Sequence, residues 1–344
     1  MKFLFAKSRE LAIVIDENCI RFLEVTLKKN QIFKIHKHLV IDNNLLQDSG
    51  NLDKFKFRHI LKTTIKEFKI KAQTVHVVIP SSLAIVRQQI MPNLPGKELK
   101  QMVNFEIGNT IHLPFEMPVF DIVKTNSEQP ADNEQGEDTC QVAIVAASGK
   151  VVYPLVEILK ENKLRPKTID IPALSLYRLF SFINPDLKDE PVLLGYLTRF
   201  GIDLHILDKG ILGFTRHIPF EMGDFINEDL KNKELNDQML LNKIQEQDNN
   251  NSFFAALSHE IERAIDFYQY TLNNRDRKIQ GCYLASNIDF SDQFYQYLQD
   301  RVDIELSPLY YQRDDLTEEE AKQYKGFEVG LGMFFRKAGD KDGD

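Results

Sequence analysis

Apolar residues alternate with polar ones, or form short runs, over most of the first 80 positions. Three such segments, Leu11–Ile15, Ile20–Leu27 and Ile32–Ile41, predict a series of antiparallel strands. Apolar side chains then recur at helical spacing over Lys54–Phe68, which predicts an amphipathic helix. The run Val75–Ile79 is almost wholly apolar, as in a strand that is buried on both faces.

The next alternating segment, Leu83–Met91, predicts a strand that carries Arg87 at its centre. The turn residues Asn93–Gly96 follow, and a helix with one apolar face comes after them. Glu106 lies on this apolar face, where an unpaired carboxylate is costly, so we expect it to pair with Arg87. The helix is expected to continue almost to Pro114, because the residue before a proline is disfavoured in the α conformation.

After residue 140, strands and helices alternate, which is typical of an α/β protein. The pattern predicts strands at Gln141–Ala147 and Lys167–Ile171, and helices at Lys150–Glu161 and Ala173–Phe182. A polar stretch from 184 to 191 follows, and there we place the boundary between two lobes. A chain of 344 residues is long enough to build two lobes with sizeable cores.

The second half of the chain begins like the first. Strands at Val192–Leu197, Ile202–Leu207 and Ile211–Ile218 repeat the opening three-strand pattern. The remaining predicted elements are helices at Met222–Glu246, Phe253–Leu272, Phe290–Asp300 and Glu318–Phe335, a strand at Gln280–Leu284 and an extended segment at Val302–Glu305.

Charge and composition narrow the class of protein. The net charge of −8 argues against a general nucleic-acid-binding protein, although it is compatible with a local basic patch. No apolar run approaches the roughly 18 residues that span a bilayer. The segment Met1–Lys7 is expected to be a loose terminus or a first strand, with a weak membrane contact as the alternative. The chain is expected to stay in the cytoplasm.

Sequence signals for enzyme chemistry are sparse. Cys19, Cys140 and Cys282 have no metal-binding spacing and are expected to be buried or neutral thiols. His36 and His38 share a strand face, but a surface role is favoured over a metal pair, and no metal site is predicted. The chain has no HExxH, GxSxG or GxxxxGK[ST] motif.

An ordered set of motifs resembles the PilM family, the actin-like cytoplasmic proteins of type IV pilus assembly. The motifs are LAIVIDENCIRFLEV (11–25), IPSS (79–82), LPGKEL (94–99), FE (105–106), LPFE (113–116), KLRPKTIDIPALSLYRLF (163–180), GFTRHIP (213–219), EIERAIDFY (260–268) and FEVGLGMFFR (327–336). Each motif is weak alone, whereas their order along nearly the whole chain is fairly specific. A relative of the same lineage, such as the cytoplasmic part of a secretion-system protein, is the alternative.

The resemblance implies a two-lobed actin-like α/β fold, of the ribonuclease H-like ATPase class, with an inserted subdomain. The first lobe would comprise residues 1–81 and 148–190, and the inserted subdomain residues 82–147. The second lobe would comprise residues 191–337, followed by a tail at 338–344.

Actin-like ATPases hold phosphates with two β-hairpins, and family members typically carry Asp-x-Gly at each. Alignment on the following strands places Val14 and Asp16 at the first Asp and Gly positions, and Tyr196 and Thr198 at the second pair. A carboxylate in place of glycine repels phosphate, and any side chain there obstructs the close approach of the backbone. Both phosphate-binding elements therefore depart from the family pattern.

The third nucleotide element of the family is a Gly-Gly turn beside the adenosine, where this chain has Ser286 and Asn287. Because all three elements depart together, no cofactor is expected, and ATP with magnesium is doubtful. We expect a non-enzymatic cytoplasmic scaffold of a type IV pilus or of a related secretion or DNA-uptake machine. The alternative is an active actin-like ATP-binding protein or ATPase of the same machinery, with rearranged metal ligands such as Asp16 and Asp203.

The resemblance also implies a partner, the cytoplasmic tail of a single-span inner-membrane assembly protein. The pilus motor ATPase and a second copy of the chain are further candidates, whereas nucleic acid is not. The protein would then be peripheral to the cytoplasmic membrane through its partner, with the acidic loop Glu128–Asp138 steering a basic tail. A groove beside the inserted subdomain would bind the tail through Arg87, Glu106, Pro114, Phe115 and Glu116. For Arg87 and Glu106, a salt bridge that only fixes strand to helix is the structural alternative.

Overall fold

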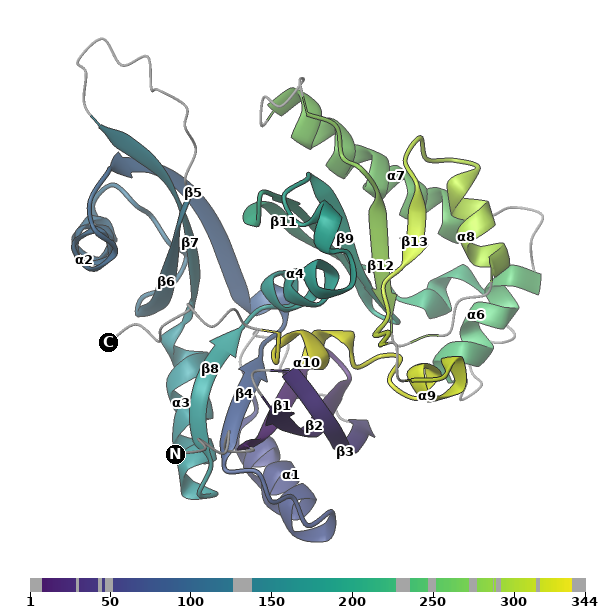
Figure 1. The fold of residues 1–344 in the computed structure, drawn as a ribbon, viewed down its shortest axis with the longest axis horizontal. Coiled ribbons are helices and arrows are strands. Elements are labelled where there is room, and N and C mark those ends of the chain that lie inside the picture. Colours follow the sequence, from purple (N-terminus) through teal and green to yellow (C-terminus); the bar gives the residue numbers. More distant parts are fainter. Residues whose placement is uncertain are drawn as a thin grey trace, which may run out of the picture.

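The computed structural model describes residues 8–28, 31–42, 45–46, 52–125, 138–226, 236–246, 252–271, 277–286, 288, 292–313 and 316–335. These residues form two five-stranded sheets, a three-stranded sheet and the helices that cover them (Figure 1). No described helix is long and apolar enough to cross a membrane. Predictions for Met1–Lys7, for nearly all of the acidic loop, for Asn287 and for the tail 338–344 lie outside the described residues.

The first sheet has the strand order β3-β2-β1-β4-β8. Its strands are β1 (Ser8–Ile15), β2 (Cys19–Lys28), β3 (Gln31–Asp42), β4 (Thr74–Val78) and β8 (Arg165–Asp170). Neighbours among β1, β2 and β3 are antiparallel, whereas β4 and β8 run parallel to β1. The three-strand opening and the buried strand before Pro80 are confirmed.

The second sheet repeats this topology, in the order β11-β10-β9-β12-β13. Its strands are β9 (Val192–Thr198), β10 (Gly201–Asp208), β11 (Ile211–Pro219), β12 (Cys282–Ser286) and β13 (Leu306–Pro308). The extended segment expected at Val302–Glu305 is misplaced, because the residues that pair with β12 are those of β13. The duplicated strand pattern is confirmed as a pair of equivalent sheets.

The third sheet, in the order β5-β7-β6, forms the inserted subdomain together with helix α2 (Gly96–Glu106). Its antiparallel strands are β5 (Ala84–Pro92), β6 (Pro118–Thr125) and β7 (Thr139–Ser148). The helix covers one face of this sheet, and the subdomain has a small hydrophobic core of its own. That core contains Met91, Leu99, Val103, Ile111, Cys140, Val142 and Ile144.

Helix α2 is shorter than its apolar spacing predicts. It ends at Glu106, well before Pro114, because Gly108 adopts a left-handed φ of 89° and the next three backbone N–H groups donate to the carbonyl of Glu106. The Glu106 carboxylate is half-buried and accepts a hydrogen bond of 2.5 Å from the Thr110 hydroxyl. No salt bridge between described residues joins Glu106 to the exposed Arg87, so the predicted pair is wrong.

The remaining helices differ from their predictions mainly in length. Those of the first lobe are α1 (Lys54–Glu67), α3 (Gly149–Glu161) and α4 (Pro172–Ile183), and those that follow are α6 (Asp237–Glu246), α7 (Ser252–Asp266), α8 (Asp292–Gln299), α9 (Glu318–Lys322) and α10 (Glu328–Gly332). A π-helical turn, Phe267–Thr271, continues α7. The single helix expected over Glu318–Phe335 is two short helices, α9 and α10, separated by a turn.

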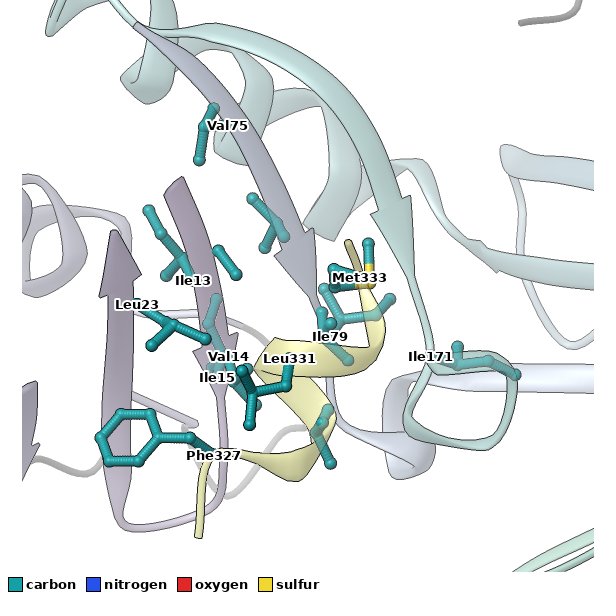
Figure 2. Packing of buried hydrophobic residues seen from close by; sticks show 14 of the residues in the cluster. Ile13, Val14, Ile15, Leu23, Val75, Ile79, Ile171, Phe327, Leu331 and Met333 are labelled. Carbon is teal, nitrogen blue, oxygen red and sulfur yellow. The ribbon is translucent and has the colours of Figure 1, made fainter. Parts of the chain in front are cut away.

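Helices α4 and α10 lie between the two large sheets (Figure 1). In Figure 2, Phe327 and Leu331 of the α10 region pack beside Val14 and Leu23 of the first sheet. The two helices cross closely, because the Ser175 hydroxyl donates to the carbonyl of Val329 and a Cβ at Gly332 would overlap the backbone of Ser175. This packing brings the turn ends of β1–β2 and β9–β10 together.

Candidate functional site

The β1–β2 and β9–β10 hairpins meet in the cleft between the lobes and are joined there by hydrogen bonds. The Tyr196 hydroxyl of β9 donates to Oδ2 of Asp16, which follows β1, across 3.1 Å. A second link is the Ser81 hydroxyl, which donates to Oδ2 of Asp203 on β10 across 2.7 Å. Each link has one partner in each lobe, so the protein's own side chains bridge the cleft.

Asp16 is the centre of a buried polar cluster. Its carboxylate forms a salt bridge with Arg21 of β2 and accepts a long hydrogen bond of 3.7 Å from the Cys19 thiol. Glu328, at the start of α10, is also buried, and burial raises its pKa to about 8 although the nearby Arg21 acts to lower it. Burial likewise raises the pKa of Tyr196, so its hydroxyl stays protonated and donates a hydrogen bond to Asp16.

Asp203 forms a second polar cluster on the opposite side of the cleft. Its Oδ1 lies 2.7 Å from Nδ1 of His217, and this hydrogen bond raises the pKa of the imidazole. Glu17 faces the same cluster, and burial raises the pKa of its carboxyl, with a smaller contribution from Asp203. Asp16 and Asp203, the alternative metal ligands, therefore both have protein partners. Within the described part of the chain, no group of three or more His, Cys, Asp or Glu side chains could hold a metal ion.

Little space remains between these side chains. A cavity of about 10 Å³ lies among Asp16, Glu17, Tyr196, Asp203 and His217. A single water molecule occupies a cavity of about this volume. The side chains of the two hairpins thus leave room for little more than one water molecule at this point of the cleft.

The other aligned positions have structural contacts. Val14 is buried and lies beside Gly330 of α10, whose Cβ position would be 3.5 Å from the valine side chain. Thr198 ties its own hairpin, since its hydroxyl donates to the carbonyl of Gly201 across 3.3 Å. The Ser286 hydroxyl donates to the carbonyl of Leu197 across 2.8 Å and so joins β12 to β9.

Beyond Ser286 the molecule is more open. A cavity of about 790 Å³ lies between the ends of β12 and β13, helix α8 and the segment from Leu309 to Glu328. It shares none of its lining residues with the small cavity between the hairpins. The closed space therefore lies between the two hairpins, and the open space lies beyond Ser286.

A second surface lies where the inserted subdomain meets α3. Glu116 pairs with Lys150 of α3 across 2.7 Å, and the N–H of Gly149 donates to the carbonyl of Met117. The Met117 side chain is 53% exposed and that of Tyr153, one helical turn after Gly149, is 57% exposed. We call the surface formed by Phe115, Glu116, Met117, Lys150 and Tyr153 the seam.

The seam brings together only some of the predicted partner-binding residues. Phe115 is half-buried there and Pro114 beside it is exposed. Arg87 lies in the middle of the edge strand β5, opposite Ile144, whereas β6 begins opposite Ser148. Along the strands, Arg87 is therefore four residues from the start of β6, and β7 lies between β5 and β6. Three of the seam residues come directly before β6 in the chain.

Sequence reasoning missed the contribution of α3 to the seam. Lys150 and Tyr153 have the spacing of an ordinary exposed helix face, and only the large aromatic side chain on that face is a signal. The cysteine prediction is confirmed, and both histidines have contacts within the protein. All three cysteines are buried and free, as predicted. His36 hydrogen-bonds Thr26 across 2.7 Å, and His38 packs edge-on against Tyr324 and Phe327.

Comparisons with known proteins agree with this architecture. A family model described as type IV pilus assembly protein PilM matches residues 13–309. A solved PilM–PilN type IV pilus biogenesis complex contains a chain that is 17% identical, with a TM-score of 0.71 over 95% of this chain and 98% of that one. Ethanolamine utilization protein EutJ from Carboxydothermus hydrogenoformans is 9% identical, with a TM-score of 0.51 over 94% of this chain and 89% of that one.

A search of the curated proteins finds no match. The family match covers most of the chain, and the two equivalent sheets have the strand order expected of the actin-like fold. The chain therefore belongs to the PilM family of type IV pilus assembly proteins and has the two-lobed actin-like fold.

Proposed function

We propose that this protein is a non-enzymatic scaffold of a type IV pilus, or of a related secretion or DNA-uptake machine. Its partner would be the cytoplasmic tail of a membrane assembly protein, bound beside the inserted subdomain. The family match and the likeness to a chain from a PilM–PilN complex support the machinery and the kind of partner.

The observation that carries the non-enzymatic part is the hydrogen bond from Tyr196 to Asp16. The sequence aligns both residues with positions where an actin-like ATPase holds phosphate, and the cavity beside them, about 10 Å³, has room for one water molecule rather than a triphosphate. The Asp16 carboxylate would also repel phosphate, because both groups are negatively charged. These residues therefore do not fit Mg-ATP.

Because an open cavity lies near Ser286, nucleotide binding is tested directly by titration. We expect isothermal titration calorimetry to detect no binding of Mg-ATP in the micromolar range, and phosphate release to match a buffer blank. A micromolar dissociation constant, about −8 kcal/mol of binding, would overturn the proposal in favour of an active ATP-binding protein. A titration with adenosine separates binding at the larger cavity from binding of the phosphates.

The seam supports the partner-binding part. Met117 and Tyr153 expose apolar surface, Phe115 is half-buried and would be the aromatic anchor, and Glu116 with Lys150 supplies charges of both signs. A short extended tail gains affinity from a few buried side chains and specificity from charged contacts at the rim. Arg87 and Glu106 remain predicted polar contacts for a tail that continues along the inserted subdomain.

A peptide titration tests this assignment. The probe is a synthetic peptide of the cytoplasmic tail of the single-span membrane protein from the same pilus system. We expect Phe115→Ala to weaken binding by about 1–3 kcal/mol and Arg87→Ala to weaken it less. Phe105→Ala is the matched control, because Phe105 is 73% exposed on α2 and outside the seam. If Phe115→Ala and Arg87→Ala both fold and bind like the wild type, the groove lies elsewhere.

A further inference from the structure

The end of the first lobe that lies farthest from the cleft carries a concentration of basic side chains. It includes two segments, residues 62–71 and 160–167, which we call the basal surface. Its cationic residues are Lys62, Lys66, Lys69, Lys71, Lys160, Lys163, Arg165 and Lys167, and its acidic residues are Glu67 and Glu161. These segments carry a net charge of +6 in a chain whose overall net charge is −8.

The fold places the two segments side by side. Helices α1 and α3 both lie at this end of the lobe (Figure 1), and Arg58, near the start of α1, forms a salt bridge of 2.8 Å with Glu161, the last residue of α3. The loop after α1 is joined to the start of β8, because the Arg165 N–H donates to the carbonyl of Gln73 across 2.6 Å. The eight cationic side chains are all exposed, and one of the two acids is already paired with Arg58.

Helix stability alone does not account for this charge. Cations in the last turn of a helix interact favourably with its dipole, which explains Lys66 and Lys160. Lys69 and Lys163 lie beyond the helix ends, at φ values of 52° and 61°. Glycine is the usual residue at such left-handed positions after a helix, and lysine is strained there. The chain therefore keeps a long cationic side chain at two places where a glycine would be less costly.

Two exposed aromatic side chains lie at the same end of the lobe. Phe68 follows the last residue of α1 and is 38% exposed. Phe33 lies at the start of β3, at the end of the sheet where β1 and β4 begin, and it is 47% exposed with the Lys28 ammonium 5.5 Å from its ring centroid. Helices that lie in a membrane interface combine lysine and arginine on one face with phenylalanine, tryptophan or leucine that enters the lipid boundary.

We propose that the basal surface docks directly on an anionic phospholipid membrane, with its lysines facing the lipid phosphates and Phe68 at the interface. Anionic leaflets attract clusters of basic residues, and the contribution grows with each lysine near the surface. The opposite sign of the rest of the chain would orient the molecule with this end towards the lipid. Seven of the eight cations are lysine, whereas nucleic-acid recognition favours the planar guanidinium of arginine.

The orientation is compatible with the proposed partner but does not depend on it. The seam lies near the first turn of α3 and the basal surface near its last, so roughly 20 Å of helix separates them. A tail of about six extended residues could span that distance from a membrane at the basal surface to the seam. Membrane docking and tail binding are measured separately, so one can fail while the other holds.

Vesicle flotation tests the proposal with the whole 344-residue chain and no partner. The vesicles contain phosphatidylcholine alone or phosphatidylcholine with phosphatidylglycerol. We expect the wild type to float only with the anionic vesicles, and less so as salt rises. The test variant is Lys62→Gln/Lys66→Gln/Lys160→Gln/Lys163→Gln, and the control with the same change in net charge is Lys97→Gln/Lys188→Gln/Lys278→Gln/Lys322→Gln. The first should weaken binding at least about 20-fold, and the second less than about threefold.

Thermal denaturation and an arginine variant control for effects on folding. All eight substituted lysines are exposed, so thermal denaturation should show both variants folded. If the test variant fails to fold, its four lysines are changed to arginine instead, which keeps the charge and should leave flotation unchanged. The proposal is then judged by whether flotation of the wild type with anionic vesicles falls as salt rises. Equal flotation with neutral and anionic vesicles, or equal loss in both glutamine variants, would overturn the proposal. Tighter binding to a DNA duplex than to anionic vesicles, lost in the first variant only, would reassign the surface to nucleic acid.

Discussion

The phenolic hydroxyl of Tyr196 lies 3.1 Å from Oδ2 of Asp16, although the two residues are 180 positions apart in the sequence. One belongs to each lobe, so the side chains of the protein join the two lobes directly. We therefore expect this hydrogen bond to contribute to stability in the absence of any ligand.

Tyr196→Phe removes the hydroxyl while keeping the ring that fills the cleft. We expect it to lower the free energy of unfolding by about 1–2 kcal/mol, because Asp16 loses one buried hydrogen bond but keeps Arg21. Chemical denaturation measures this change. Tyr153→Phe removes an exposed hydroxyl and should have no comparable effect. Equal changes in the two variants would contradict the role assigned to the Tyr196 hydroxyl.

Ser81→Ala removes the second link between the lobes. Asp203 keeps its hydrogen bond to His217, so we expect a loss of about 1 kcal/mol in the free energy of unfolding. The neighbouring Ser82 is exposed, and Ser82→Ala is therefore a matched control expected to be near neutral. If Ser82→Ala lowered the free energy of unfolding and Ser81→Ala did not, the role assigned to Ser81 would be wrong.

Gly332→Ala tests the crossing of α4 and α10. A Cβ at Gly332 would overlap the carbonyl group of Ser175, so the helices would have to separate. We expect a loss of about 2–3 kcal/mol, or a failure to fold, as for other overpacked sites. At Gly96 no atom lies within 4 Å of the Cβ position, and Gly96→Ala should be neutral or slightly stabilising. The melting temperature of Gly332→Ala should therefore be well below that of Gly96→Ala. Equal melting temperatures would show that α4 and α10 can separate at little cost in free energy.

The strands and the paired sheets could be predicted because alternation and apolar runs are local signals, and they recur with the same order in both halves of the chain. The end of α2 could not. Its apolar spacing continues through Ile107 and Ile111, but Gly108 turns the backbone and leaves Ile111 in the core without a helix. Glu106 thereby became a helix end instead of a buried position, and the expected pair with Arg87 was lost.

The contacts in the cleft could not be predicted from the sequence, for a different reason. The sequence indicates that the family's aspartate and glycine positions are replaced, but it does not indicate that Tyr196 bonds Asp16 or that Ser81 bonds Asp203. Those contacts depend on how two lobes pack around α4 and α10. The seam was half predicted for the same reason, since Lys150 and Tyr153 belong to a helix far along the chain from Phe115.

We expect the buried carboxyl of Glu328 to make the stability of the protein depend on pH. Burial raises the pKa of this carboxyl from an ordinary value of 4.5 to about 8 in the folded protein. Between pH 4.5 and pH 8 the folded state holds a proton that the unfolded state has lost, so the free energy of unfolding falls as pH rises through this window. Glu328→Gln keeps the shape of the side chain and removes the titration.

We therefore expect the wild type to lose about 2–4 kcal/mol relative to Glu328→Gln between pH 5 and pH 8, measured by urea denaturation at both pH values. The exposed Glu319→Gln removes the same charge from the surface of α9 and should follow the wild type at both pH values. If wild type and Glu328→Gln instead change in parallel, Glu328 is ionised in the folded state. Its charge would then be balanced by Arg21, and the buried cluster would hold two carboxylates around one guanidinium.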